Sequence, residues 1–259
     1  MDEHTLRAAL AHLNLAVVYY LDTVGSTNDY ARQLAESGAA DGTLVVADEQ
    51  TRGRGRLDRR WLTPAGSALA FSLVLRPSPA EIERVGLFAP LCGVAVCAAL
   101  RLEFGLAAEV KWPNDVLLER RKTCGVLVEA HWLGATLQSV IAGIGVNVAR
   151  ASVPPPGALL FPATCVEEQV GRPVARESLL AAVLAAFGSW RSRLGSPAFL
   201  ETWESWLAFK GEMVNVESAA GILSGRVLGV TPDGSLRLQT AFGSEQAVSV
   251  GDVRLRPAD

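Results

Sequence analysis

The apolar residues of this 259-residue chain fall into short runs separated by polar and turn-forming segments. Short apolar runs that end at Gly, Pro, Asn or Asp favour β-strands over helices. The chain therefore predicts strands over residues 15–24, 43–50, 67–76, 110–132 and 136–148. The fourth range is long enough for three strands, and the Pro-Asn and charged segments inside it predict the turns between them.

Helical periodicity appears between and after these strands. Three capable N-cap residues at 26–28 precede a run whose apolar residues share one helical face, and Gly38 follows that run. A helix is therefore predicted between these two boundaries. Longer apolar segments predict further helices over 79–103, 177–194 and 197–209.

The longest apolar stretch runs from Val85 to Leu102. Pro90 and Arg101 interrupt it, and Ala, Gly and Cys are frequent in it. A helix that spans a bilayer needs about 20 predominantly apolar residues in succession. The stretch is therefore predicted to be a buried helix and not a membrane span.

The pattern changes near Gly211, after a proline-rich connector at 153–162 and the last two predicted helices. Short alternating runs follow, separated by Gly, Asp and Pro, and the segment Thr231–Ser235 (TPDGS) is typical of a hairpin turn. This pattern predicts a small antiparallel barrel. The chain is accordingly divided into a domain over 1–210 and a second over 211–259.

Composition narrows the class of protein. Hydrophobic residues make up 49% of the chain, so a sizeable core is possible without disulfides. The net charge of −3 argues against a surface built for nucleic acid. The four cysteines show no CxxC spacing, and with three histidines they form no zinc pattern. The acidic start lacks a signal-peptide profile, so reduced thiols in a cytoplasmic protein are expected.

One cationic segment stands out against this acidic background. Arg54, Arg56, Arg59 and Arg60 lie close to Gly53 and Gly55 in the segment 51–60 (TRGRGRLDRR). Arginine forks match phosphate and carboxylate oxygens, and glycines let backbone N–H groups approach an anion closely. The segment is not a P-loop, because no Gly-Lys-Ser/Thr follows. An anion site is predicted, with a solvated surface loop and an RNA contact as alternatives.

Three further motifs carry candidate chemistry. The KWPND segment at 111–115 could hold Asn114 and Asp115 toward a ligand, or it could be an ordinary turn. Lys122 precedes an apolar strand, where it is either a solvated hairpin charge or a point charge aimed at the sheet. The GIGVNV segment at 143–148 places two glycines and an asparagine near a strand end, a weak pattern by itself.

Together these motifs resemble the catalytic domain of biotin–protein ligases. The order and spacing match in STN at 26–28, QTRGRGRLDRRW at 50–61, KWPND at 111–115, RKTCGVLVE at 121–129 and GIGVNV at 143–148. The resemblance implies an α+β fold, in which helices flank a mixed β-sheet of the class II synthetase type. It also implies that the segment after residue 210 is an SH3-like β-barrel.

The resemblance implies an ATP- and Mg-dependent enzyme that converts biotin to biotinoyl-5′-AMP. The biotinoyl group would then pass to a lysine of a biotin carboxyl carrier domain in a biotin-dependent carboxylase. A homodimer is a possible assembly, whereas nucleic acid and membrane partners are not expected. The alternatives are a lipoate–protein ligase, or a biotin-binding relative without ligase activity.

The resemblance also assigns roles to residues. The catalytic residues are expected to be Arg56 and Lys122. The expected biotin-binding residues are Ser26, Thr27, Asn28, Gln50, Gly53, Arg54, Gly55, Arg56, Lys122 and Gly125. The expected ATP-binding residues are Arg54, Arg56, Arg59, Trp61, Lys111, Asn114, Asp115 and Asn147. No residue is assigned as a direct metal ligand, although Asn114 and Asp115 could hold the Mg²⁺–phosphate assembly.

Two departures from the family pattern matter. Family members often carry Gly where this chain has Asp58, so a stiffer or less cationic loop is expected. Only 25 residues precede the STN motif, too few for the helix-turn-helix domain that some members carry. A short form without a repressor role is therefore expected.

Overall fold

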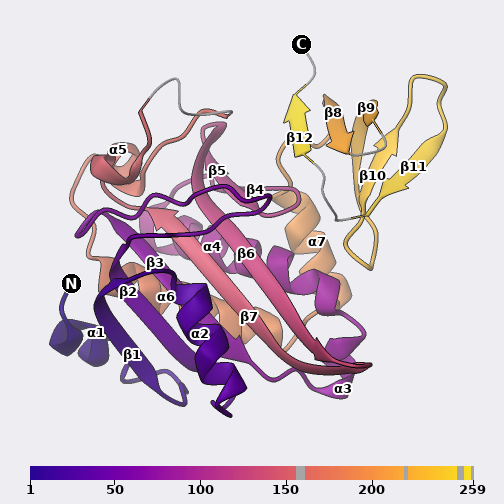
Figure 1. Cartoon of the computed structure of the whole chain (residues 1–259). Helices are drawn as coiled ribbons and strands as arrows, with labels where there is room; N and C mark the ends of the chain where they lie inside the picture. Colours follow the sequence, from indigo (N-terminus) through magenta and orange to yellow (C-terminus); the bar gives the residue numbers. More distant parts are fainter. Residues whose placement is uncertain (156–160, 219–220, 250–253, 258–259) are drawn as a thin grey trace.

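Two β-sheets of different size organise the chain (Figure 1). The computed structural model describes residues 1–155, 161–218, 221–249 and 254–257. A seven-stranded mixed sheet with helices on both faces takes up the N-terminal part, and a five-stranded antiparallel sheet follows. The predicted α+β class is confirmed, whereas the predicted C-terminal barrel is an open sheet within the described residues.

The large sheet has the strand order β1-β2-β3-β7-β6-β5-β4. Only β1 and β2 pair in parallel, and the other neighbours are antiparallel. The predicted strands are confirmed within a few residues at each end. Their bounds are β1 (Val18–Val24), β2 (Thr43–Gln50), β3 (Ala68–Leu75), β4 (Glu109–Lys111), β5 (Asp115–Leu118), β6 (Arg121–Leu133) and β7 (Thr136–Asn147).

Helices cover both faces of this sheet (Figure 1). On one face, α2 (Thr27–Glu36) packs Ala31 and Ala35 on a small apolar cluster of β2, β3 and β7. On the other face lie α4 (Phe88–Phe104) and α6 (Arg176–Arg191), which pack on each other within the main core. Because strand side chains alternate between faces, β2 and β3 supply both clusters.

Helix α4 forms the interior of the main core. The 20 residues Val85–Phe104 are apolar and long enough to cross a membrane, but 72% of their most apolar window is buried within the protein. The prediction of a buried helix is therefore confirmed. The predicted continuous helix over 79–103 is wrong, because the structure divides it into α3 (Pro79–Ile82), a 3₁₀ turn (Val85–Leu87) and α4.

Pro90 accounts for the start of α4, whereas the break between α3 and the 3₁₀ turn lies earlier, at Glu83 and Arg84. A proline inside a continuous helix removes a hydrogen bond and collides with the preceding turn. In α4, Pro90 lies in the first turn, where backbone N–H groups have no intrahelical acceptor. The new helix start therefore accommodates the proline.

The remaining helices are short or lie after the sheet. The predicted helices over 177–194 and 197–209 correspond to α6 and α7 (Pro197–Ser205). Two helices were not predicted, α1 (Glu3–Leu10) and α5 (Val166–Val170). The signal for α1 was present, because Asp2 caps it and its leucines bury on one side. The connector at 153–162 lies partly outside the described residues.

The C-terminal sheet has the strand order β11-β10-β9-β8-β12. Its predicted hairpin is confirmed, since the Thr231 amide donates to the Ser235 carbonyl oxygen at 2.9 Å. Within the described residues the edge strands β11 and β12 do not pair with each other, so the sheet is open and not a closed barrel. The bounds are β8 (Met213–Ser218), β9 (Gly221–Val230), β10 (Leu236–Gln239), β11 (Glu245–Val248) and β12 (Arg254–Pro257).

The two sheets are in contact. The indole Nε1 of Trp112, in the turn between β4 and β5, donates to the Gly234 carbonyl oxygen at 3.1 Å. Glu204 of α7 accepts a hydrogen bond from the Val230 amide of β9 at 3.0 Å. The division of the chain at residue 210 stays a prediction.

Candidate functional site

A cavity of about 670 Å³ lies beside the predicted motifs. This volume is typical of small-molecule sites. All sixteen residues that the sequence assigned to biotin or ATP line it: Ser26, Thr27, Asn28, Gln50, Gly53, Arg54, Gly55, Arg56, Arg59, Trp61, Lys111, Asn114, Asp115, Lys122, Gly125 and Asn147. Segments that are up to about 120 residues apart in the sequence therefore meet at one site.

The lining of this cavity is strongly cationic. Its described basic residues are Arg52, Arg54, Arg56, Arg59, Arg60, Lys111, Lys122 and Arg256. Asp115 is the one acidic residue among the described lining residues. This imbalance favours an anionic ligand, because like charges gathered around a cavity destabilise each other until an anion enters.

The segment 50–63 forms an irregular hairpin over the cavity. The Gly55 amide donates to the Arg59 carbonyl oxygen at 2.7 Å, and the Trp61 amide donates to the Gly53 carbonyl oxygen at 2.9 Å. A Cβ atom on Gly53 would lie 2.4 Å from the Trp61 carbonyl oxygen, so only glycine fits there. At the tip, Leu57 and Asp58 have φ values of 55° and 56°, which favour glycine.

Two glycines of β6 and β7 lie under this hairpin, where the sheet has no side chains. Gly125 and Gly145 are register partners on the two strands. A Cβ atom on Gly145 would lie 2.3 Å from Trp61 Nε1, and one on Gly125 would lie 3.0 Å from Trp61 Cζ3. The indole of Trp61 therefore packs directly on the backbone of the two glycines. Its buried Nε1 has no hydrogen-bond partner among the described residues.

A lysine cluster, made of Lys111, Asp115 and Lys122, borders the cavity. Lys122 Nζ lies 2.6 Å from Asp115 Oδ1, and Lys111 Nζ lies 3.9 Å from Asp115 Oδ2. Lys111 is only 3% exposed. Two ammonium groups thus share one carboxylate, and the cluster carries one uncompensated positive charge when all three groups are ionised.

Burial and charge act on the cluster in opposite directions. Burial lowers the pKa of Lys111 to about 8, and the charge of Lys122 adds to this effect while Asp115 opposes it. Burial alone would raise the pKa of Asp115, but the charges of Lys122 and Lys111 outweigh it and hold that pKa below its ordinary value. Asp115 is therefore ionised at neutral pH, and Lys111 is close to losing its proton.

The STN motif and Gln50 bind one another at the start of α2. The Thr27 amide and hydroxyl donate to Gln50 Oε1 at 2.8 and 3.1 Å, and Gln50 Nε2 donates to Thr63 Oγ1 at 3.0 Å. Ser26 is buried, and its side chain makes no cap hydrogen bond to the described part of α2. The N-terminal end of α2 therefore presents polar groups with fixed positions to a ligand.

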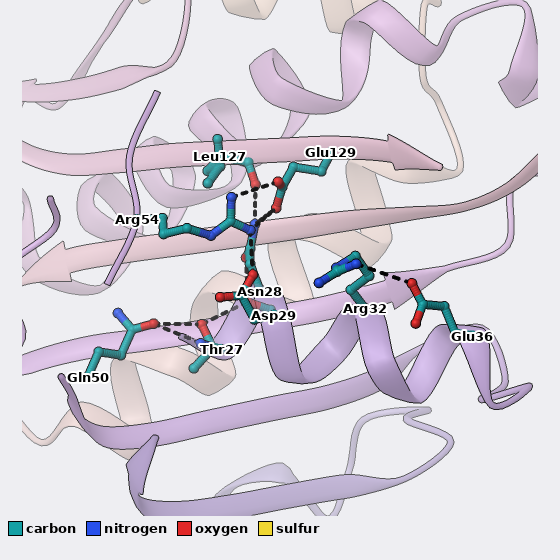
Figure 2. A network of polar contacts seen from close by, with 10 residues as sticks. Thr27, Asn28, Asp29, Arg32, Glu36, Gln50, Arg54, Leu127 and Glu129 are labelled. Carbon is teal, nitrogen blue, oxygen red and sulfur yellow. Dashed lines mark hydrogen bonds and ion pairs between the residues drawn. The ribbon is translucent and has the colours of Figure 1, made fainter. Parts of the chain in front are cut away.

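A clamp network, made of Arg54, Glu129, Asn28 and Asp29, joins the hairpin to α2 and β6 (Figure 2). Sequence reasoning assigned no role to Glu129 or Asp29. Glu129 ends the motif at 121–129, and its position directly after the apolar run 124–128 was the available signal. Arg54 was expected to bind substrate anions, and its guanidinium contacts two carboxylates.

The remaining predicted residues make contacts around the same cavity. Arg56 Nη1 donates to Asn114 Oδ1 at 3.2 Å. Asn147 is buried, and its Nδ2 donates to the Thr164 carbonyl oxygen at 3.1 Å. Arg256 of the C-terminal sheet, whose guanidinium lies 6.0 Å from the Phe161 ring centroid, lines the cavity and was not predicted. No group of three or more candidate metal ligands occurs in the described parts of the chain.

Comparisons with known proteins identify two family domains. The model of the biotin/lipoate A/B protein ligase family matches residues 20–147. The model of the biotin protein ligase C-terminal domain matches residues 210–256. The first match contains all of the predicted site residues, and the second contains the C-terminal sheet up to Arg256.

Individual relatives agree with these matches. The chain is 36% identical to the biotin–[acetyl-CoA-carboxylase] ligase of Paracoccus denitrificans over 228 residues, which are 85% of this chain and 93% of that protein. It is 34% identical to the bifunctional ligase/repressor BirA of Bacillus spizizenii over 239 residues, 91% of this chain and 73% of the relative. A solved biotin protein ligase from Aquifex aeolicus, in complex with biotin and ATP, superimposes with a TM-score of 0.80. That structure shares 30% identity and covers 94% of this chain and 100% of its own.

Proposed function

The chain belongs to the biotin/lipoate A/B protein ligase family, and from this premise we propose that it is a biotin–protein ligase. The enzyme activates biotin with ATP and transfers it to a lysine of a biotin carboxyl carrier domain. The observation that carries this proposal is the meeting of all predicted motifs at one cationic cavity. Biotin and ATP are both anions, and such a cavity fits both of them.

In the first step, an oxygen of the biotin carboxylate attacks the α-phosphorus of ATP. A new O–P bond forms, the bond between the α-phosphorus and its bridging oxygen breaks, and pyrophosphate leaves. The two anions repel each other, so the site must hold them together and stabilise the charge that develops. Lys122 and Arg56 are proposed for this task, because both line the cavity and contact neighbouring residues, Arg56 at Asn114 and Lys122 at Asp115.

The polar end of α2 is proposed to bind the ureido ring of biotin. Ser26, Thr27, Asn28 and Gln50 line the cavity, and hydrogen bonds order the side chains of the last three. Buried polar groups that lose a partner cost binding energy, so a ligand without the ureido ring should be rejected. Gly53, Gly55 and Gly125 let the backbone and Trp61 pack closely beside the proposed ligand, because a Cβ atom on each would contact Trp61 or Arg59.

The nucleotide is proposed to bind on the lysine side of the cavity. Lys111, Arg59 and Asn114 would contact the phosphates, while Trp61 and Asn147 would contact the nucleoside. Asp115 suits a Mg²⁺ ion that is held mainly by phosphate oxygens, since such ions use one or two protein carboxylates. Bound Mg²⁺ would neutralise charge on the triphosphate.

In the second step, the uncharged ε-amine of the acceptor lysine attacks the carbonyl carbon of biotinoyl-5′-AMP. An amide bond forms, AMP leaves and the amine loses a proton. The intermediate must be kept from water until the acceptor arrives. The hairpin over 50–63 is proposed to provide this cover, since it closes one side of the cavity.

Assembly and location are further parts of the proposal. Strand β1 is an edge of the seven-stranded sheet, and an edge strand can pair with a second copy, so a homodimer is proposed. Light scattering would measure the mass in solution. The reaction uses ATP, and all four cysteines are buried thiols, which fits the cytoplasm.

Isotope exchange between pyrophosphate and ATP tests the proposed function. The purified chain with Mg²⁺ is given biotin, lipoate or no acid. The proposal requires exchange with biotin alone. Exchange with lipoate alone would refute the role of the STN motif and Gln50. Biotin binding without exchange would identify a relative that has lost ligase activity.

A further inference from the structure

Glu129 joins two segments that the proposed function treats separately. Its Oε1 accepts a hydrogen bond from Arg54 Nη1 at 2.9 Å. Its Oε2 accepts from Arg54 Nη2 at 2.8 Å and from Asn28 Nδ2 at 2.7 Å (Figure 2). One half-buried carboxylate on β6 therefore holds an arginine of the hairpin and an asparagine of α2 at the same time.

Arg54 is held from two sides. Besides the two bonds to Glu129, its Nη2 lies 2.8 Å from Asp29 Oδ1. The hydrogen bonds with Glu129 raise the pKa of Arg54. Burial would raise the pKa of Glu129, but the hydrogen bonds from Arg54 and Asn28 outweigh burial and lower it. One cation thus faces two carboxylates, and the clamp network carries net negative charge, which does not attract an anion.

Asn28 is fixed by the same network. Both hydrogens of its Nδ2 are used, by Glu129 and by the Leu127 carbonyl oxygen at 3.2 Å. Its Oδ1 lies 2.7 Å from Ser72 Oγ. A Cβ atom on Gly143 would lie 1.9 Å from that Oδ1, so the glycine makes room for the amide. The amide therefore has one orientation in which all these bonds form.

We propose that Arg54 is a positioning residue and not a ligand for the substrate anions. With Glu129 it docks the hairpin on α2 and β6 and holds the Asn28 amide in one orientation at the cavity wall. This inference rests on the proposed function and deepens it. It states that Arg54 and Glu129 hold the biotin-binding residues in place without contacting a substrate. Arg56, Arg59 and the lysine cluster remain for the anions.

Hydrogen exchange of the ligand-free full chain tests the docking role without any enzyme activity. Glu129→Gln and Arg54→Gln each break the charged pair, and exchange in residues 51–62 should become about tenfold faster or more in both. Asp29→Asn is the control, since it removes only the more exposed contact and should have a smaller effect. The amides of β7 report that the fold is intact. Unchanged exchange in 51–62 in both variants would overturn the proposal.

A double-mutant cycle tests whether Arg54 contacts the anions. The Michaelis constants for biotin and ATP are measured by pyrophosphate exchange for the two single variants and for the Arg54→Gln/Glu129→Gln variant. The proposal expects the constant for biotin to rise about tenfold in each single variant, with no further rise in the double variant. The constant for ATP should change less than about twofold.

An anion ligand would behave differently. Arg54→Gln would then raise the constant for ATP, and would do so again in the Glu129→Gln background, because the two effects would add. That additive result would overturn the positioning role. Absence of biotin-dependent exchange in the unmodified chain would refute the proposed function, and the hydrogen-exchange experiment would still decide the docking role.

Discussion

The clamp network and the lysine cluster line the same cavity but differ in how their charges are balanced. In the clamp network one arginine meets two carboxylates at 2.8–2.9 Å. In the lysine cluster two lysines meet one carboxylate, and Lys111 lies 3.9 Å from it. In the clamp network the positive charge of Arg54 is fully matched by carboxylates. In the lysine cluster one of the two positive charges has no carboxylate to match it. An excess of buried charge is destabilising without a counterion. We therefore assign the clamp network a supporting role and the lysine cluster a role in anion binding.

Removal of Lys122 should have the largest effect on activity. Lys122→Ala takes away the ammonium closest to Asp115 and one of the charges proposed to stabilise the transition state. Loss of such a group lowers turnover by about 10²–10³-fold. Biotin-dependent pyrophosphate exchange measures the effect, and Arg121→Ala, whose side chain pairs with Glu168 at the surface, is the matched control. Undiminished exchange in Lys122→Ala would remove Lys122 from the site.

Removal of Lys111 should stabilise the fold while weakening ATP binding. The folded protein releases the Lys111 proton near pH 8, whereas the ordinary pKa is 10.5. Each pKa unit corresponds to about 1.4 kcal/mol, so Lys111→Met should raise the free energy of unfolding by up to about 3 kcal/mol at neutral pH.

The pH dependence of the difference in free energy of unfolding between Lys111→Met and the unmodified protein is the sharper test. Below pH 8 the folded protein carries the full cost of the buried ammonium. As pH rises from 8 to 10.5, the unfolded chain binds more protons than the folded one, so the unmodified protein gains stability and the difference from Lys111→Met shrinks. Denaturant unfolding at pH 7 and pH 10 measures this. An equal difference at both values would contradict the burial of a charged lysine.

Arg56→Gly should have an intermediate effect. Arg56 contacts Asn114 and lines the cavity. Its loss should speed the release of biotinoyl-5′-AMP and slow its net formation by about tenfold, the equivalent of about 1.4 kcal/mol. Rapid filtration of the enzyme–adenylate complex measures the release. Normal synthesis and retention of the adenylate would count against this assignment.

Substitution of Asp58 should have the smallest effect, and that effect is on the free energy of unfolding. Its φ of 56° favours glycine, so Asp58→Gly should change the free energy of unfolding by less than about 1 kcal/mol, in the stabilising direction. Asp58→Ala is the control, because it removes the same charge but keeps the Cβ atom. Equal melting temperatures for the two variants would show that backbone conformation at this position does not matter.

The local sequence was sufficient for the strands and for the identity of the site. Apolar runs bounded by turns predicted all seven strands of the large sheet, since burial and turn chemistry are local signals. The motif residues were predicted to share one site, and all of them line one cavity. Their individual roles stay predictions.

Long-range pairing was not predictable from the sequence. Glu129 lies 75 residues from Arg54, and no local pattern indicates that these two side chains meet. Burial of Lys111 depends on Phe161, which packs beside it from a distant segment. The division of the predicted helix over 79–103 was missed because apolar composition outweighed the signal of Pro90.

The salt dependence of ligand affinity tests the contrast between the two networks most directly. The dissociation constant of a non-hydrolysable analogue of biotinoyl-5′-AMP is measured at increasing salt for the unmodified chain, Lys122→Ala and Arg54→Gln, the last two of which each lose one positive charge. Salt screens a direct contact between a cation and an anionic ligand. We predict a clearly weaker salt dependence for Lys122→Ala and an unchanged one for Arg54→Gln. Equal weakening in both variants would contradict this prediction.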